Sequence, residues 1–101
     1  MAVTSKALYR GAASTTLTTT LYTVPSSTTA VVTNIVVTNT SANTATFDLS
    51  LAGIKLAAGV ILSPNSVTTF DIKQTLVAAN TIQGGASTTS VNFHISGVEI
   101  A

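Results

Sequence analysis

The sequence predicts an all-β fold: a single β-sandwich, jelly-roll-like, with roughly seven to nine short antiparallel strands and no substantial helix. Thr is the commonest residue, and Ser and Thr together make up nearly a third of the chain. The long straight-chain residues that favour helices, apart from Leu, are scarce, with one Glu, one Arg, three Lys, two Gln and one Met. β-Branched side chains pack well on a pleated surface and are unfavourable in helices. Apolar residues recur along the whole chain, so a buried core is expected instead of a disordered Ser/Thr-rich linker.

The chain is expected to divide into two segments. Residues 1–14 lack clean periodicity and are expected to form an N-terminal arm that orders on a partner, or an edge strand. Residues 15–101 are expected to form the sandwich domain. Within it, "TLTTTLYTVP" predicts an early strand that ends at Pro25. "AVVTNIVVTNT" then carries valines on both of its faces, which is typical of a central strand.

The middle of the chain alternates more regularly. "TATFDLSLA" places Ala45, Phe47, Leu49 and Leu51 on one face, which predicts a half-buried strand. A tight turn is expected at Gly53, after which "IKL" continues the sheet. "VTTFDIK" and "TLVAANTIQGGAS" predict three further strands, with turns near Ala79 and at the glycine pair of residues 84–85.

The last predicted strand, "VNFHISGVEI", contains the only histidine and the only glutamate of the chain. Phe93 and Ile95 face one way and His94 the other. At Gly97 the apolar set changes parity, which predicts a β-bulge that returns Glu99 to the face of His94. The two residues would still lie roughly 16 Å apart along the strand. We therefore expect an exposed or interface histidine, no catalytic residues and no enzymatic activity.

Composition excludes several kinds of site. Cysteine is absent, so neither a disulfide nor a thiolate metal site can form. One histidine cannot build a multi-histidine metal site, and no phosphate-binding loop or nucleophile elbow occurs, so no metal, cofactor or small-molecule substrate is expected. Four cations and three carboxylates give a net charge of +1. The cations are scattered along the chain and do not form the basic stripe that nucleic acid requires. The longest apolar run is far shorter than a bilayer span, and the N-terminus lacks a secretory h-region, so no membrane partner is expected.

Aromatic side chains provide the other candidates. The three phenylalanines lie at apolar strand positions, and we predict a core made of Phe47, Leu49, Phe70, Phe93 and Ile95. Tyr9 and Tyr22 remain open, since either ring could serve as a stacking platform for a sugar in a carbohydrate-binding module.

The run "LYTVPSSTTAVVTNIVVTNTSANTATFDLSLAG", with "SPNSVTTFDIKQTLVAANTIQG" and the closing "FHISGVEI", resembles small β-sandwich structural proteins of tailed-bacteriophage virions. The resemblance covers roughly residues 17–101, and proteins of this type occur on virions as capsid decoration (cement) proteins or as parts of the tail and neck; the decoration role is the one we expect. The resemblance implies a non-enzymatic protein on the capsid surface of the virion, made in the host cytoplasm. It also implies two partners: the major capsid protein, and further copies of the chain in a homo-oligomer, most commonly a homotrimer. The alternative placement is the tail, neck or fibre.

The sparse charge is consistent with an assembled protein, because a near-zero net charge favours association. The N-terminal segment carries two of the four cations ahead of the first clear strand. We therefore predict an interface that includes Lys6, Leu8, Tyr9 and Arg10.

Overall fold

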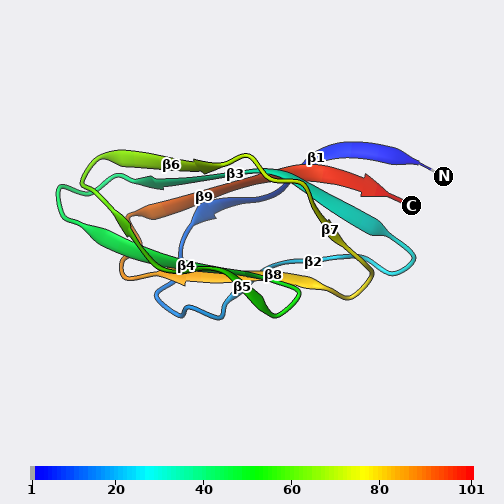
Figure 1. Cartoon of the computed structure of the whole chain (residues 1–101), viewed down its shortest axis with the longest axis horizontal. Coiled ribbons are helices and arrows are strands. Elements are labelled where there is room, and N and C mark those ends of the chain that lie inside the picture. Colours follow the sequence, from blue (N-terminus) through cyan, green and yellow to red (C-terminus); the bar gives the residue numbers. More distant parts are fainter. Residues whose placement is uncertain (1) are drawn as a thin grey trace.

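A computed structural model describes residues 2–101 and contains nine strands and no helix within that range (Figure 1). No helix that is long and apolar enough to cross a membrane occurs among those residues. The strands are β1 (Val3–Ala12), β2 (Thr20–Thr23), β3 (Thr29–Asn39), β4 (Ala45–Leu51), β5 (Ile54–Leu62), β6 (Ser66–Phe70), β7 (Gln74–Leu76), β8 (Thr81–Ala86) and β9 (Val91–Ile100).

The strands form two antiparallel sheets that pack face to face. Sheet A has the order β1-β9-β3-β6, with β7 also paired to β3, and sheet B has the order β2-β8-β4-β5. Figure 1 shows the two sheets stacked as the upper and lower layers of an elongated sandwich. When β6 and β7 are taken as one interrupted strand, each sheet has the four-strand order of a jelly roll. The predicted fold class is therefore confirmed.

The core lies between the two sheets, where the predicted residues meet. Phe47, Leu49 and Phe93 are fully buried and Ile95 is 1% exposed. Phe47 contacts both other phenylalanine rings, with ring centroids 6.0 Å from Phe70 and 6.2 Å from Phe93. Phe70 is only partly buried, because β6 is an edge strand, but it packs against the same cluster. The local alternation of apolar residues thus identified the centre of the core.

The β4–β5 hairpin turns where the sequence predicts it. Ala52 and Gly53 both have positive φ angles, 52° and 78°. Two successive left-handed residues match the twist of a two-residue hairpin, and glycine adopts such a conformation without steric cost. The turn at Ala79 is also present, with φ 72°.

The glycine pair at 84–85 was wrongly predicted as a turn, since it lies inside β8. Its role is to allow a close approach. A Cβ at Gly85 would lie 2.4 Å from the carbonyl oxygen of Thr16, in the connection between β1 and β2. That connection accompanies β8, because Gly84 N–H donates to Thr19 O at 2.9 Å and Ala86 N–H donates to Ser14 O at 2.9 Å. Residues 14–19 therefore cover part of β8.

The predicted bulge near Gly97 exists, but on the two neighbouring strands. In β1 the register with β9 shifts between Ala7 and Tyr9, and in β3 it shifts between Val32 and Asn34. β9 itself alternates regularly through Gly97. A Cβ at Gly97 would lie 2.4 Å from Val31 O and 2.9 Å from Leu8 Cδ1, so only glycine fits between the two bulges. The β3 bulge also brings Val32 into the core and leaves Val31 outside, so the alternation of buried residues along β3 is interrupted at this point.

Candidate functional site

The only histidine and the only glutamate lie on opposite faces of β9. Because β9 carries no extra residue at Gly97, Glu99 stays on the inner face of sheet A, while His94 is on the outer face. The expectation that both share the outer face was therefore wrong. His94 lies directly opposite Arg10 of β1 and Val36 of β3, so no carboxylate occupies a cross-strand position beside it.

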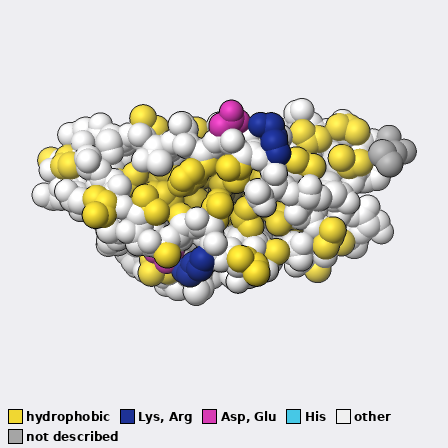
Figure 2. Space-filling view, in the orientation of Figure 1, with side chains coloured by type: hydrophobic (Ala, Val, Ile, Leu, Met, Phe, Trp, Pro, Cys, Tyr) yellow, Lys and Arg dark blue, Asp and Glu magenta, His cyan; other side chains and the backbone are white. Residues whose placement is uncertain are grey.

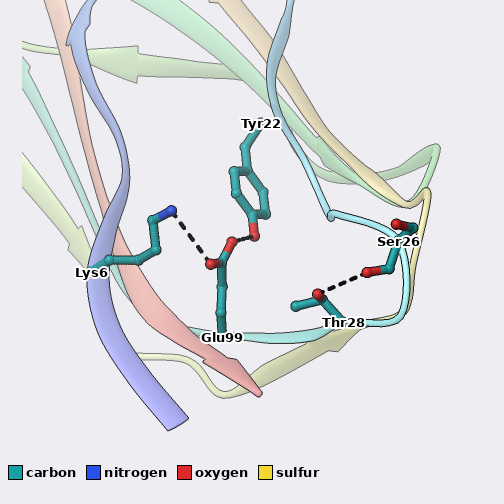
Figure 3. Close-up of polar contacts among 5 residues, drawn as sticks. All are labelled: Lys6, Tyr22, Ser26, Thr28 and Glu99. Atoms are coloured by element: carbon teal, nitrogen blue, oxygen red, sulfur yellow. Dashed lines mark hydrogen bonds and ion pairs between the residues drawn. The ribbon is translucent and has the colours of Figure 1, made fainter. Parts of the chain in front are cut away.

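Glu99 instead belongs to a polar cluster that joins the two sheets. The Tyr22 hydroxyl of β2 donates a short hydrogen bond to Glu99 Oε2, and Lys6 Nζ of β1 lies 3.4 Å from Glu99 Oε1. Figure 3 shows the carboxylate between the phenol and the ammonium group. The Glu99 side chain is 16% exposed and that of Lys6 is 43% exposed, so the carboxylate is largely withdrawn from solvent whereas the lysine is not. The three groups of the cluster come from both ends of the chain and from both sheets.

The cluster shifts the pKa values of two of its members. Burial raises the pKa of Tyr22 well above its ordinary value, and the hydrogen bond to Glu99 and the negative charge of that carboxylate act in the same direction. The hydrogen bond from Tyr22 lowers the pKa of Glu99, and Lys6 lowers it further, against the opposing effect of burial. Both shifts favour the neutral phenol beside the charged carboxylate. This arrangement links the two sheets through a hydrogen bond to a charged acceptor.

A second carboxylate stabilises the edge of sheet B. Asp48 accepts a hydrogen bond from Lys55 Nζ at 2.7 Å and another from the backbone N–H of Gly59 at 3.0 Å. The bond from Lys55 lowers the pKa of Asp48, and the bond from Gly59 adds to this effect. Gly59 has a positive φ of 57°, which directs its N–H to the carboxylate within the irregular part of β5. Asp48 therefore serves the local structure of the β5 edge.

The four predicted interface residues have different environments. Arg10 is exposed on β1, whereas Leu8 is only 7% exposed and belongs to the core. Tyr9 packs partly against the core and donates its hydroxyl to Ala12 O at 2.9 Å. Lys6 is engaged with Glu99. Residues 3–12 form an edge strand that pairs along its length with β9, and Arg10 is the member of the set whose side chain is free for an outside contact.

Neither tyrosine presents a free ring as a stacking platform. Tyr9 and Tyr22 are half-buried, both pack against the core, and both hydroxyls are bonded within the chain. The carbohydrate-binding alternative therefore loses the two residues on which the sequence analysis based it. No group of three or more His, Cys, Asp or Glu side chains that could hold a metal ion occurs within residues 2–101.

Sequence analysis missed an apolar cleft on one long side of the sandwich. It has a volume of about 260 Å³ and lies between β5 and β7. Its lining is mostly apolar, with Leu51, Ile54, Leu56 and Leu76, and it includes the charged Lys55, which is paired with Asp48. Figure 2 shows hydrophobic side chains along this side, in a band between the two sheets. Ile54 is 71% exposed, although its pairing partner Leu51 is buried. The only signal in the sequence was the apolar character of "IKL" directly after the Gly53 turn, which does not show that the residue is uncovered.

Comparisons with known proteins give a general likeness of fold. No family model matches the chain, and no curated protein matches it. Two solved structures, both described as pentameric capsid proteins isolated from metagenomic phage sequences, are 23% and 22% identical, with TM-scores of 0.44 and 0.39. They cover 94% and 96% of this chain, which spans 58% and 60% of theirs. A likeness this loose concerns the arrangement of strands alone.

Proposed function

We propose that the chain is a structural protein of a bacteriophage virion, which binds the assembled capsid shell as a homo-oligomer and reinforces it. The resemblance of residues 17–101 to virion β-sandwich proteins suggested this role. The observation that supports it best is the pairing of charge at the surface. Each of the three carboxylates forms an ion pair with a lysine: Glu99 with Lys6, Asp48 with Lys55, and Asp71 with Lys73.

The outer face of sheet A carries few charges. Its cross-strand rows contain valine, threonine, serine, alanine and asparagine, with Arg10 and His94 as the basic members: Ala12-Asn92-Thr38-Val67, Arg10-His94-Val36-Thr69 and Ser5-Val98-Val31-Thr75. Hydroxyl and small apolar groups lose less hydration free energy on contact than charges do. A broad face of this kind suits close packing against another protein, and it favours binding that depends weakly on salt.

Reinforcement would follow from multivalency. An oligomer that contacts several neighbouring shell subunits makes each later contact effectively intramolecular, so that local opening of the shell has to break several contacts together. No covalent step, metal or cofactor takes part in this mechanism. The chain is accordingly proposed to have no catalytic role, and His94 to serve as a surface residue.

Co-sedimentation with empty shells of the phage that encodes the chain tests this function. We expect the protein to pellet with shells, to saturate at hundreds of copies per particle, and to raise the temperature at which shells disrupt. Binding should weaken by less than about ten-fold between low and high salt, since few charges contribute. Failure to bind shells, or saturation at a dozen copies or fewer, would contradict the decoration role, and the latter result would favour the tail, neck or fibre.

Sedimentation of the free protein measures its oligomeric state. The resemblance suggests a trimer, and this number stays a prediction. If the free protein were a monomer and still bound shells at high copy number, the decoration role would stand and the proposed homo-oligomer would be wrong.

A further inference from the structure

The two edges of sheet A are open, and they run in opposite directions. β1 pairs with β9 alone, and β6 pairs with β3 alone, so each has an outer row of backbone N–H and C=O groups without strand partners. Every neighbouring pair from β1 to β6 is antiparallel, which makes β1 and β6 antiparallel to each other. The β6 edge of one copy can therefore meet the β1 edge of another with antiparallel polarity.

Sheet B offers less to a strand partner. β2 has only four residues, and β8 beside it is accompanied by residues 14–19. The β5 edge is irregular, with register shifts in its pairing to β4 and a positive φ at Gly59. Irregular and covered edges are the devices by which proteins prevent edge-to-edge pairing. The β1 edge also contains a bulge, at Leu8, but residues 3–7 and 9–12 pair regularly with β9 on either side of it, so sheet A remains the layer that can continue from one copy to the next.

The charges at these two edges are complementary. On β1, Arg10 is exposed and forms no ion pair with a carboxylate of residues 2–101. Just after β6, Asp71 has a side chain that is 87% exposed, against 16% for Glu99 and 13% for Asp48. Its bond to Lys73 joins two exposed groups and contributes little to stability, so Asp71 is the carboxylate most available to an outside cation.

The side that carries Asp71 also carries the uncovered apolar surface. It contains β5, β6 and β7, the cleft of about 260 Å³, and the exposed Ile54 at its rim. Val67 of β6 is 60% exposed and Val77, just after β7, is 57% exposed. The molecule measures 45 × 21 × 18 Å, so a long side provides room for the ~800 Å² per partner of a standard protein interface.

We infer that copies of this chain assemble head to tail, with the β1 edge of one copy against the β5-β6-β7 side of the next, and with Arg10 of the first copy contacting Asp71 of the second. This inference rests on the proposed function, because it names the contact that holds the homo-oligomer together. The contact is heterologous, because it joins two different surfaces. An open row of copies therefore has one unpaired surface at each end, and the row closes into a ring when the rotation between copies permits. The contact covers the apolar cleft and gives Arg10 of β1 a carboxylate partner.

A charge exchange tests the contact with this protein alone. Sedimentation velocity over a concentration series would be measured for Arg10→Glu, for Asp71→Lys and for the double variant. Each single variant places like charges together and is expected to raise the concentration of half-dissociation at least ten-fold, whereas the double variant restores an opposite-charge pair and is expected to recover most of the loss. Gln83→Glu on β8, an inner strand of sheet B that pairs with β2 and β4, adds a negative charge away from the proposed contact; it is the control and should leave the oligomer unchanged.

A second variant makes the test independent of charge pairing. Ile54→Asp places a charge at the rim of the cleft, at a side chain that the free chain already exposes, and it should dissociate the oligomer while the thermal melting curve of the folded chain changes little. Single variants that leave the oligomer intact, or a double variant that fails to recover it, would overturn the inference. A wild-type chain that is monomeric throughout would overturn it too. Shell binding in the co-sedimentation assay then decides the proposed function separately.

Discussion

The Tyr22 hydroxyl of β2 donates a hydrogen bond to the Glu99 carboxylate of β9, and so links sheet B to sheet A outside the apolar core. Both groups are largely withdrawn from solvent, and Lys6 completes the cluster. A hydrogen bond to a charged acceptor is stronger than one between neutral groups. The cluster therefore fixes the relative position of the first and last strands over the end of the sandwich.

Replacing Tyr22 with Phe removes the donor and keeps the ring. We expect a loss of about 1–3 kcal/mol in the free energy of unfolding, since a partly buried carboxylate loses a partner. Urea titration measures it. Tyr9→Phe is the matched control, because the Tyr9 hydroxyl donates to the neutral carbonyl oxygen of Ala12, and its loss should be smaller. Equal losses in the two variants would show that the charged partner contributes nothing extra.

Acid should destabilise the fold through two carboxylates. The folded pKa values of Asp48 and Glu99 lie below their ordinary values of 3.8 and 4.5. A lowered folded pKa contributes stability that is present above the unfolded pKa and is lost as the pH falls through the folded pKa. We expect the free energy of unfolding to fall below about pH 5. Denaturant titrations from pH 7 to pH 2 measure this. The combined Asp48→Asn and Glu99→Gln variant should be less stable at pH 7, but its free energy of unfolding should change less between pH 7 and pH 2. If the free energy of unfolding of that variant fell as steeply with acid as that of the wild-type chain, other groups would cause the acid sensitivity.

Substitutions of Phe93 and His94 can be compared directly, because the two residues are adjacent in β9 and lie on opposite faces of sheet A. Phe93 is fully buried against Phe47, so Phe93→Ala should cost roughly 3–5 kcal/mol in unfolding free energy. His94→Ala on the outer face should change it by less than about 0.5 kcal/mol. If both variants melted alike in thermal denaturation, the assignment of the two faces of β9 would be wrong.

Gly97 should tolerate no side chain. A Cβ there would meet the Val31 carbonyl oxygen at 2.4 Å, which is backbone and cannot turn aside as a side chain would. We expect Gly97→Ala to cost roughly 1–3 kcal/mol, the usual range for overpacking. Gly11→Ala is the control: its nearest neighbour is the Tyr9 hydroxyl oxygen at 3.2 Å, at the end of a side chain that can shift. A neutral Gly97→Ala variant would show that the two bulges can rearrange.

The fold class and the core were predictable because their signals are local. β-Branched composition and the alternation around Phe47 and Phe93 depend only on neighbouring residues in the sequence. The face of Glu99 was not predictable in this way. Its orientation depends on where β1 and β3 place their extra residues, and those bulges form against β9, far away in the sequence. Parity around Gly97 signalled an irregularity but did not say which strand contains it.

The glycine pair of β8 and the uncovered side illustrate the same limit. Gly84 and Gly85 are needed because residues of the β1–β2 connection and of β4 approach β8, and nothing in "TIQGGAS" reveals that approach. Likewise, the exposure of Ile54 results from sheet order, which leaves β5 and β7 at the rim with a cleft between them. Candidate contact residues such as Asp71 become recognisable only when the edge strands are known.

The pairing of β1 with β9, in which Val3 lies opposite Ile100, has a consequence for synthesis of the protein. Sheet A cannot be completed until β9 has left the ribosomal exit tunnel, although β1 leaves the tunnel well before it. Folds dominated by such distant pairings form slowly, in milliseconds to seconds. Until β9 emerges, β1 lacks its partner strand and Leu8 is uncovered, which is the condition under which unfinished chains aggregate most readily.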